Sequence, residues 1–160
     1  MTAAANNDWA GRLAALGIDL PAVAAPVAAY VPAVRHGDLV YTSGQLPFVD
    51  GALPAAGKVG DGPGLVSADD AKTAARQCAL NALAAVDALV GLDAITRIVK
   101  VTGFVASAPG FGGQPQVING ASEVLGEIFG DDGVHARSAV GVAELPLDSP
   151  VEVELIVAVR

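Results

Sequence analysis

The residue of this chain with the clearest potential for binding chemistry is Arg137, which lies in the segment VHARSAVGVAELP. In a strand, Arg137 shares one face with Ala139 and Gly141. These small neighbours leave space around the guanidinium, whose planar fork of donors matches a carboxylate and stays charged when partly desolvated. The pattern predicts a site for a small carboxylate, but spacing alone supports an ion pair between subunits, with Glu152 or Glu154, equally well.

Those two acids form the second feature with chemical potential. Glu152 and Glu154 alternate with the apolar residues of VEVEL, so both carboxylates project from one face of the last predicted strand. Such a pair can position a water molecule. The pattern by itself favours a more ordinary interpretation, which is a solvated strand edge or a salt bridge between subunits.

Metal, thiol and nucleotide chemistry are not indicated. His36 and His135 are far apart, and neither has a second histidine or cysteine at a spacing useful for a metal. Cys78 is the only cysteine and is expected to be a buried thiol on a helix. The glycine-rich segments 57–64 and 110–113 match neither a P-loop nor a dinucleotide-binding fingerprint, so we expect no cofactor and no metal.

Length and composition predict one closely packed domain over residues 1–160. Hydrophobic residues make up 52% of the chain and aromatic residues only 4%, so alanine and valine supply most of the apolar surface. The 17 acidic and 9 scattered basic residues give a net charge of -8, which argues against a nucleic-acid partner. The N-terminus lacks a secretory pattern and the apolar run 20–34 contains three prolines, so we expect a cytoplasmic protein without a membrane span.

Periodicity predicts the elements that must position Arg137 and Glu152. Ser67 is expected to cap a long helix that ends near Gly91, because its hydroxyl can accept from the backbone N–H near Asp70. Downstream we predict a strand over 95–105, a helix over 117–128 closed by Gly130, and strands over 136–142 and 151–159. Upstream we predict a helical extension over about 8–20, an extended stretch over 24–34, a strand over 38–42, a hairpin at Asp50 and Gly51, and a glycine-rich loop over about 55–66.

This order predicts an α+β fold in which a mixed sheet carries two long helices on one face. In the strand over 95–105, the pattern assigns Val99, Val101 and Val105 to one face and Lys100, Thr102 and Phe104 to the other. A single layer of helices leaves the second sheet face uncovered. Because we expect apolar residues such as Ile98, Phe104 and Ala139 on that face, we predict that the chain self-associates.

Four segments, taken together, resemble the RidA/YjgF family. ARSAVGVAELP and VEVE are similar to the family runs A-R-S/A-x-V-x-V-A-x-L-P and V/I-E-I/V-E, and QVINGASEVLGEIFG to V-N-x-x-Y-x-x-F-F. AYVPAVRHGDLVYTSGQLP and IVKVTGFV match two further family segments in the same order. The resemblance covers most of the chain from Tyr30 onward. It implies a chorismate-mutase-like fold and a homotrimer with three ligand clefts at subunit interfaces.

The best-known branch of this family hydrolyses reactive enamine and imine intermediates, such as 2-aminoacrylate, to 2-oxo acids and ammonia without a cofactor. The resemblance therefore implies a hydrolase similar to a 2-iminobutanoate/2-iminopropanoate deaminase. In that role Arg137 binds the substrate carboxylate and Glu152 holds or activates the attacking water. The further cleft residues that the resemblance implies are Tyr30, Ser43, Gly44, Asn119 and Ala139.

The chain also departs from the family pattern. Ala139 stands where the family often has cysteine, and Ala28 and Ala29 replace the usual Gly-Pro before Tyr30. The extension over 8–20 and the loop over 55–66 are typical of a longer subgroup, whose substrates the resemblance does not specify. An alternative to the deaminase is a non-catalytic module that senses a small carboxylate metabolite. Ribonuclease activity, also attributed to relatives, is disfavoured by the net charge of -8.

Overall fold

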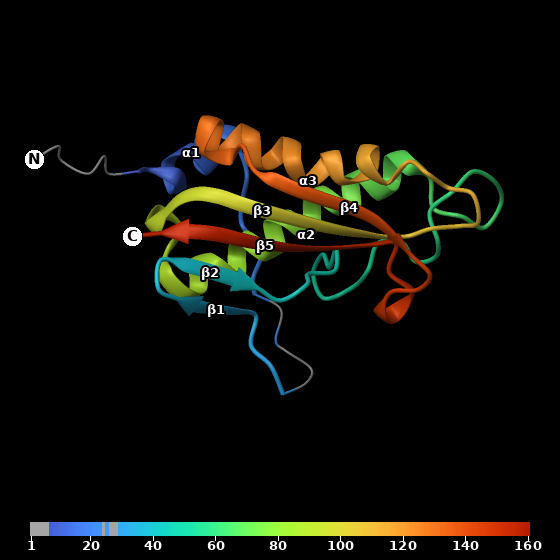
Figure 1. The fold of residues 1–160 in the computed structure, drawn as a ribbon, viewed down its shortest axis with the longest axis horizontal. Coiled ribbons are helices and arrows are strands. Elements are labelled where there is room, and N and C mark those ends of the chain that lie inside the picture. The colour runs from blue at the N-terminus through green and yellow to red at the C-terminus, as the bar shows by residue number, and fades with distance from the viewer. Residues whose placement is uncertain (1–6, 24, 26–28) are drawn as a thin grey trace, which may run out of the picture.

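The computed structural model describes residues 7–23, 25 and 29–160. Helices α2 (Ala68–Val90) and α3 (Gln114–Phe129) pack on one face of a five-stranded sheet, with the shorter α1 (Trp9–Leu16) beside α3 (Figure 1). The strands are β1 (Ala33–His36), β2 (Leu39–Thr42), β3 (Ile95–Ala106), β4 (Ala136–Val142) and β5 (Val151–Val159). Their order in the sheet is β1-β2-β5-β3-β4, with β3 and β4 parallel and the other neighbours antiparallel. The predicted α+β fold with a mixed sheet is confirmed.

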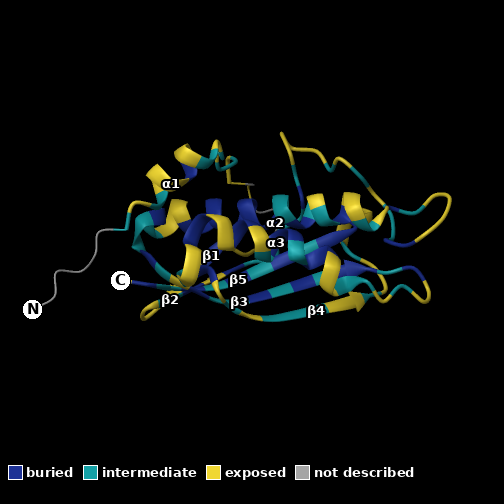
Figure 2. Ribbon diagram, turned by 90° about the horizontal axis from the view of Figure 1, so that it is seen from above, coloured by how far each residue is buried: buried dark blue, intermediate teal, exposed yellow. Residues whose placement is uncertain are grey.

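Local sequence signals set the limits of α2. The Ser67 hydroxyl accepts from the backbone N–H of Asp70 at 3.1 Å, and Gly91 ends the helix with a φ of 83°. Both limits were predicted, because a hydroxyl satisfies a free N–H at the first turn and glycine adopts positive φ without strain. The stripe of small residues, including buried Cys78, lets α2 approach the sheet closely. Figure 2 shows that the buried residues lie between the helices and the sheet.

Close packing of α3 against α2 depends on one glycine. A Cβ atom at Gly120 would collide with the backbone carbonyl of Lys72, so only glycine permits this approach. Above this contact, ion pairs join the outer surfaces of the two helices, from Lys72 to Glu123 at 3.0 Å and from Arg76 to Glu127 at 3.1 Å. The helix pair forms a continuous layer that supports the sheet from one side.

The prediction for the two faces of β3 was partly wrong. The register against β5 shifts between Ile98 and Lys100, so Val99 is an extra residue in the strand. Ile98 is therefore fully buried under the helices together with Val101 and Val105, whereas Val99 is only half-buried. A strict alternation cannot anticipate a bulge, because the extra residue reverses which side chains point inward.

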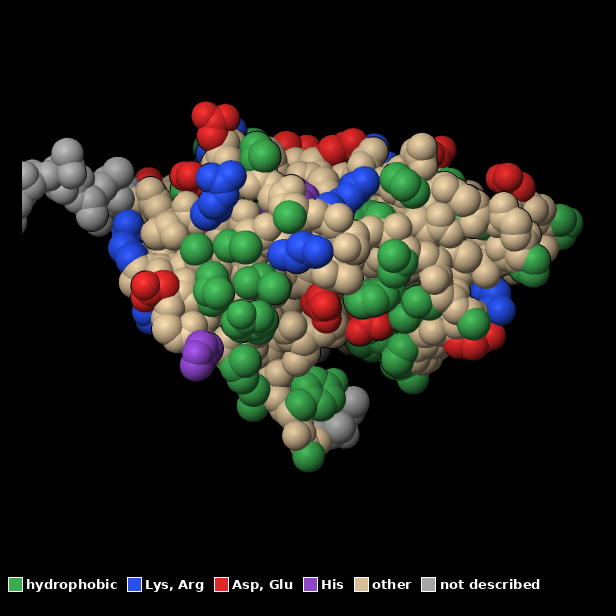
Figure 3. All heavy atoms as spheres, viewed as in Figure 1, with side chains coloured by type: hydrophobic (Ala, Val, Ile, Leu, Met, Phe, Trp, Pro, Cys, Tyr) green, Lys and Arg blue, Asp and Glu red, His purple; other side chains and the backbone are tan. Residues whose placement is uncertain are grey.

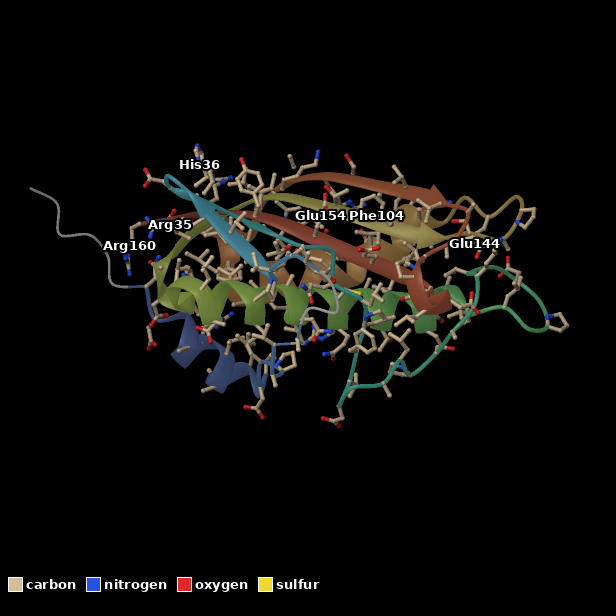
Figure 4. All side chains as sticks on the ribbon, turned by 90° about the horizontal axis from the view of Figure 1, so that it is seen from below. Arg35, His36, Phe104, Glu144, Glu154 and Arg160 are labelled. Atoms are coloured by element: carbon tan, nitrogen blue, oxygen red, sulfur yellow. The ribbon has the colours of Figure 1, made fainter. Side chains whose placement is uncertain are left out.

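The second face of the sheet has no helix over it in the described part of the chain. Phe104 and Glu154 lie on this side, away from the helices (Figure 4). Of the apolar residues expected here, Phe104 is present, but Ile98 lies under the helices and Ala139 packs against the core. The register brings Val34, Tyr41 and Ile156 side by side in their place.

Val34 is 51% exposed and Tyr41 40% exposed, and Figure 3 shows this hydrophobic region beside a few charged groups. We name the face away from the helices the open face. An open face with exposed apolar residues favours contact with another protein surface.

The segments before β2 and after it differ from their predictions in extent. Helix α1 stops at Leu16, short of the predicted 20, because Gly17 turns the backbone into the left-handed region with φ 67°. Part of the stretch expected to be extended forms β1, while residues 24 and 26–28 lie outside the described residues. The Asp50 and Gly51 turn is present, but its strands amount to a single bridge between Val49 and Ala52.

The loop over 55–66 is tied to the rest of the chain through Val59, which bridges to Val66 and to Ser107. None of the helices in the described ranges combines the length and hydropathy that a membrane span requires.

Candidate functional site

The guanidinium of Arg137 lies between β4 and α3. In the register Arg137 pairs with Val101, so its side chain is on the helix side of the sheet. Its Nη1 donates to the Asn119 Oδ1 at 2.8 Å and to the Ser122 Oγ at 3.3 Å. Both acceptors are neutral, and among the described residues no carboxylate forms an ion pair with Arg137. The guanidinium therefore has no counter-ion among the described residues.

The contacts of Arg137 use only one of its nitrogen atoms. A guanidinium carries five N–H donors in a plane. The two donors on Nη1 are engaged, whereas Nε and Nη2 have no acceptor in the part of the chain that the structure describes. This second edge of the fork matches the two oxygens of a carboxylate. Arg137 is thus oriented by Asn119 and Ser122 while its other edge is available to a ligand.

A histidine extends this network. His135 Nδ1 lies 2.6 Å from the Gly133 carbonyl oxygen, which can only accept, so Nδ1 carries a proton. In the neutral ring His135 Nε2 then accepts from the Ser122 hydroxyl at 2.9 Å, and the Ser122 oxygen accepts from Arg137. With the neutral ring, this order of hydrogen bonds from Gly133 to Arg137 fixes the orientation of the Ser122 hydroxyl.

Sequence reasoning missed Ser122 and His135. As a site residue, His135 was considered only as a metal ligand, and Ser122 occupies the position of the tyrosine in the family motif V-N-x-x-Y. Two spacings in the sequence could have indicated these residues. Ser122 follows Asn119 by three residues on a helix, and His135, which directly precedes β4, lies two residues before Arg137 in extended backbone. Each spacing places the pair on a common face.

Glu152 lies on the open face, beside a cavity of about 490 Å³. Tyr30 and Gly44 line the same cavity, and its walls include Leu46, Phe48 and Leu147. The Glu152 side chain is half-buried and forms no salt bridge within the described ranges. Burial, and secondarily repulsion from Glu154, raises the pKa of the Glu152 carboxyl above its ordinary value. A carboxyl with a raised pKa and no counter-ion is suited to exchange protons with a ligand or water.

The chain approaches Glu152 closely at Gly44. A Cβ atom at Gly44 would overlap the Glu152 Oε1, so any larger residue would displace the carboxylate. Paired hydrogen bonds between Gln45 and Val153, at 2.8 and 3.0 Å, hold this segment against β5. The neighbouring Ser43 makes two further hydrogen bonds. Its hydroxyl donates to the Val31 carbonyl at 2.7 Å, and its backbone N–H donates to the Pro32 carbonyl at 2.8 Å. Ser43 thereby anchors the segment that carries Tyr30.

The structure divides the predicted site residues between two faces of the sheet. Arg137 is on the helix side with Asn119, and Ala139 follows it on the same face, where it pairs with Gly103. We name these three residues the arginine half-site. Glu152 pairs with Phe104 on the open face, where it shares the cavity with Tyr30 and Gly44. We name these latter three the glutamate half-site. One chain does not bring Arg137 and Glu152 together.

Comparison with known proteins identifies the family. A family model described as "Endoribonuclease L-PSP" matches residues 21–159. Protein TCP17 of Trypanosoma cruzi is 42% identical over 159 residues, covering 98% of both chains. The 2-iminobutanoate/2-iminopropanoate deaminase of Salmonella typhimurium is 38% identical over 138 residues, covering 85% of this chain and 91% of that protein. The chain belongs to the RidA/YjgF family.

A solved structure of a protein of unknown function from Agrobacterium tumefaciens superimposes with a TM-score of 0.85 and 42% identity. The superposition covers 95% of this chain and 92% of the Agrobacterium chain. Together with TCP17, it shows that the chain is similar to other proteins along nearly its whole length, including residues before Pro21 that the family model does not match.

Proposed function

We propose that this protein hydrolyses small reactive enamines and imines to 2-oxo acids and ammonia. The observation that carries the proposal is that Arg137 and Glu152 are both partly buried and neither is paired with an opposite charge in the described chain. Removing charges from water is unfavourable unless a partner compensates. A substrate carboxylate compensates Arg137, and a proton from water compensates Glu152. Relatives named as imine deaminases support the same activity.

The proposed site is formed by two copies of the chain. Because the arginine half-site and the glutamate half-site lie on opposite faces of the sheet, the first of one copy must meet the second of its neighbour. Such a contact joins two different surfaces, and it closes into a ring when the rotation between copies allows. The contact would also cover apolar residues of the open face such as Val34 and Tyr41. The family resemblance implies three copies in the ring, hence a homotrimer with three clefts.

In this cleft the substrate carboxylate binds the Nε and Nη2 edge of Arg137, and Tyr30 forms one wall. Glu152 of the neighbouring copy accepts a proton from a water molecule as the water oxygen forms a bond to the imine carbon. The electron pair of the C=N bond moves to nitrogen, which takes up the proton held by Glu152 and so restores the carboxylate. The amine nitrogen takes up a second proton, released by the added hydroxyl, as the C–N bond breaks; ammonia leaves and the hydroxyl oxygen becomes the carbonyl oxygen. One water is consumed, and one ammonia and one 2-oxo acid are released.

The direct experiment is to incubate the protein with a system that generates 2-iminobutyrate or 2-aminoacrylate and to follow 2-oxo acid formation. The proposal expects acceleration over the spontaneous reaction. Saturable carboxylate binding without any acceleration would instead identify the chain as the non-catalytic sensing module. RNA cleavage, named in the description of the family model, is disfavoured by the net charge of -8, because phosphate backbones are repelled by a negative protein.

Replacing Gly44 with alanine should lower kcat/KM by about 10- to 100-fold, because a misplacement of a catalytic group by about 1 Å can cost this much. The added methyl group would push the Glu152 carboxylate out of its position. Gly112→Ala is the matched control, since a Cβ at Gly112 meets nothing within 4 Å. Steady-state rates of both variants at equal enzyme concentration provide the measurement. Equal rates in the two variants would contradict a role for the Glu152 position.

On the acid side of the pH-rate profile, activity should fall at a pH above the ordinary pKa of a glutamate, since the pKa of Glu152 is raised. The carboxylate is the form that accepts a proton, so activity falls as the pH drops through this raised pKa. Glu154→Gln removes the repulsion that contributes to the increase, so this fall in activity should move to lower pH. Profiles of kcat/KM for the two proteins test this prediction. A fall in activity that moves to higher pH, or does not move, would contradict it.

A further inference from the structure

The cavity beside Glu152 is walled mainly by apolar groups. Tyr30, Leu147 and the pair Leu46 and Phe48 line it from three segments, and none of the described residues that line it is basic. Glu152 is the single charged group among them. An apolar wall with one ionisable group matches a ligand that has a reactive polar end and an apolar remainder.

Leu147, which forms part of this wall, has an unusual backbone conformation. It has a φ of 59°, and the next residue, Asp148, has a φ of 57°, both in the left-handed region that disfavours such residues. Backbone hydrogen bonds hold the turn, from Gly57 N–H to the Asp148 carbonyl at 2.7 Å and from Ser149 N–H to that of Pro146 at 3.1 Å. Leu147 is 68% exposed even though it is apolar. The fold thus maintains a strained turn that presents a leucine at the cavity, as is common at functional sites.

The cavity is also large for the smallest imines. Liquid water takes up about 30 Å³ per molecule, so about 490 Å³ corresponds to roughly sixteen groups of that size. In the proposed site the substrate carboxylate is held by Arg137 of the neighbouring copy, which leaves this cavity to the substrate side chain. The single methyl group of 2-iminopropanoate would fill only a small part of the volume that one copy of the chain encloses, and unfilled apolar volume contributes no binding.

We propose that the cavity beside Glu152 receives the side chain of the substrate, and that the protein prefers 2-imino acids with bulky apolar side chains over those with one or two side-chain carbons. This inference rests on the proposed function and specifies the substrate class of the same site. The hydrolysis is the step given above. Burial of the side chain against Phe48 and Leu147 supplies the preference, because each additional buried methylene group strengthens binding.

The test compares imines generated by an amino-acid oxidase from alanine and from leucine, with ammonia release as the readout. We expect kcat/KM to be at least about 10-fold higher for the leucine-derived imine. Leu147→Asn should reduce this ratio about 10-fold, because asparagine tolerates the left-handed conformation but presents a polar group. Leu89→Asn, which replaces an exposed leucine of α2 that does not line the cavity, should leave the ratio unchanged.

The outcomes separate this inference from the proposed function. Equal or faster turnover of the alanine-derived imine would overturn the inference and leave the deaminase proposal intact. The same conclusion would follow if Leu147→Asn left the ratio of the two kcat/KM values unchanged. If neither imine is accelerated, the deaminase proposal fails. The cavity is then tested by calorimetry with 4-methyl-2-oxopentanoate and pyruvate. Binding of the larger acid at least about 10-fold tighter would support the inference, and equal binding would overturn it.

Discussion

Replacing Arg137 with alanine is expected to lower kcat/KM for imine hydrolysis by at least about 100-fold, as expected for the loss of a partly buried charge that pairs with the ligand. Asn119 and Ser122 already orient the guanidinium, so its Nε and Nη2 edge is in position before the substrate binds. Saturable binding of small carboxylates should be lost together with turnover. Steady-state kinetics and calorimetry with a 2-oxo acid measure the two effects.

Arg137→Lys should recover little of this loss. A lysine ammonium is a compact charge that cannot donate in a plane to Asn119, Ser122 and a carboxylate together. Arg35→Ala serves as the control for charge, because Arg35 lies on exposed β1 and contacts Gly37 and Asp38. Near wild-type kcat/KM in the Arg137→Lys variant, or undiminished activity in the Arg137→Ala variant, would contradict the role given to the fork.

Replacing Glu152 with glutamine should lower kcat by about 100- to 10,000-fold with little change in KM, since this is the usual contribution of a general base. Glutamine keeps the size of the side chain but cannot accept the proton of water. The same change should not harm folding. Because the pKa of Glu152 is higher in the folded state than in the unfolded state, ionised Glu152 destabilises the folded state, and a neutral amide removes that cost.

The melting temperature of Glu152→Gln is therefore expected to stay level or rise while activity falls. Glu123→Gln, which changes an exposed glutamate paired with Lys72, controls for loss of a surface charge. A parallel loss of activity and stability in Glu152→Gln would indicate a structural role. A large increase in KM with unchanged kcat would assign Glu152 to substrate binding.

Much of the fold follows from local signals in the sequence. Ser67 and Gly91 bound α2 as predicted, and β4 and β5 have the predicted limits, because capping groups and alternating apolar residues act over a few residues. The bulge at Val99 did not follow, since it depends on the register between β3 and β5. The small extent of the hairpin at Asp50 has a similar origin. Its turn is local, but the length of its strands is decided by what they pack against.

In the candidate site too, some features follow from local sequence and others depend on contacts between distant segments. Arg137 and Glu152 were selected as candidate site residues from their residue types and from the family resemblance, and their roles stay predictions. Their separation onto opposite faces required the registers of β4 and β5 with β3, which no single segment encodes. The hydrogen bonds of His135 and Ser122 join a strand to a helix, so their partnership depended on how α3 packs beside β4.

The central claim is that each site combines the arginine half-site of one copy with the glutamate half-site of another. Its most direct test is to mix Arg137→Ala and Glu152→Gln chains, each nearly inactive alone, and to let them reassemble. In a ring of randomly mixed copies, an intact site needs Arg137 from a Glu152→Gln chain and Glu152 from an Arg137→Ala chain. Each requirement is met with a chance of about one half, so about one quarter of wild-type activity should return at equal mixing. Absence of any recovery in verified mixed oligomers would contradict a site shared between copies.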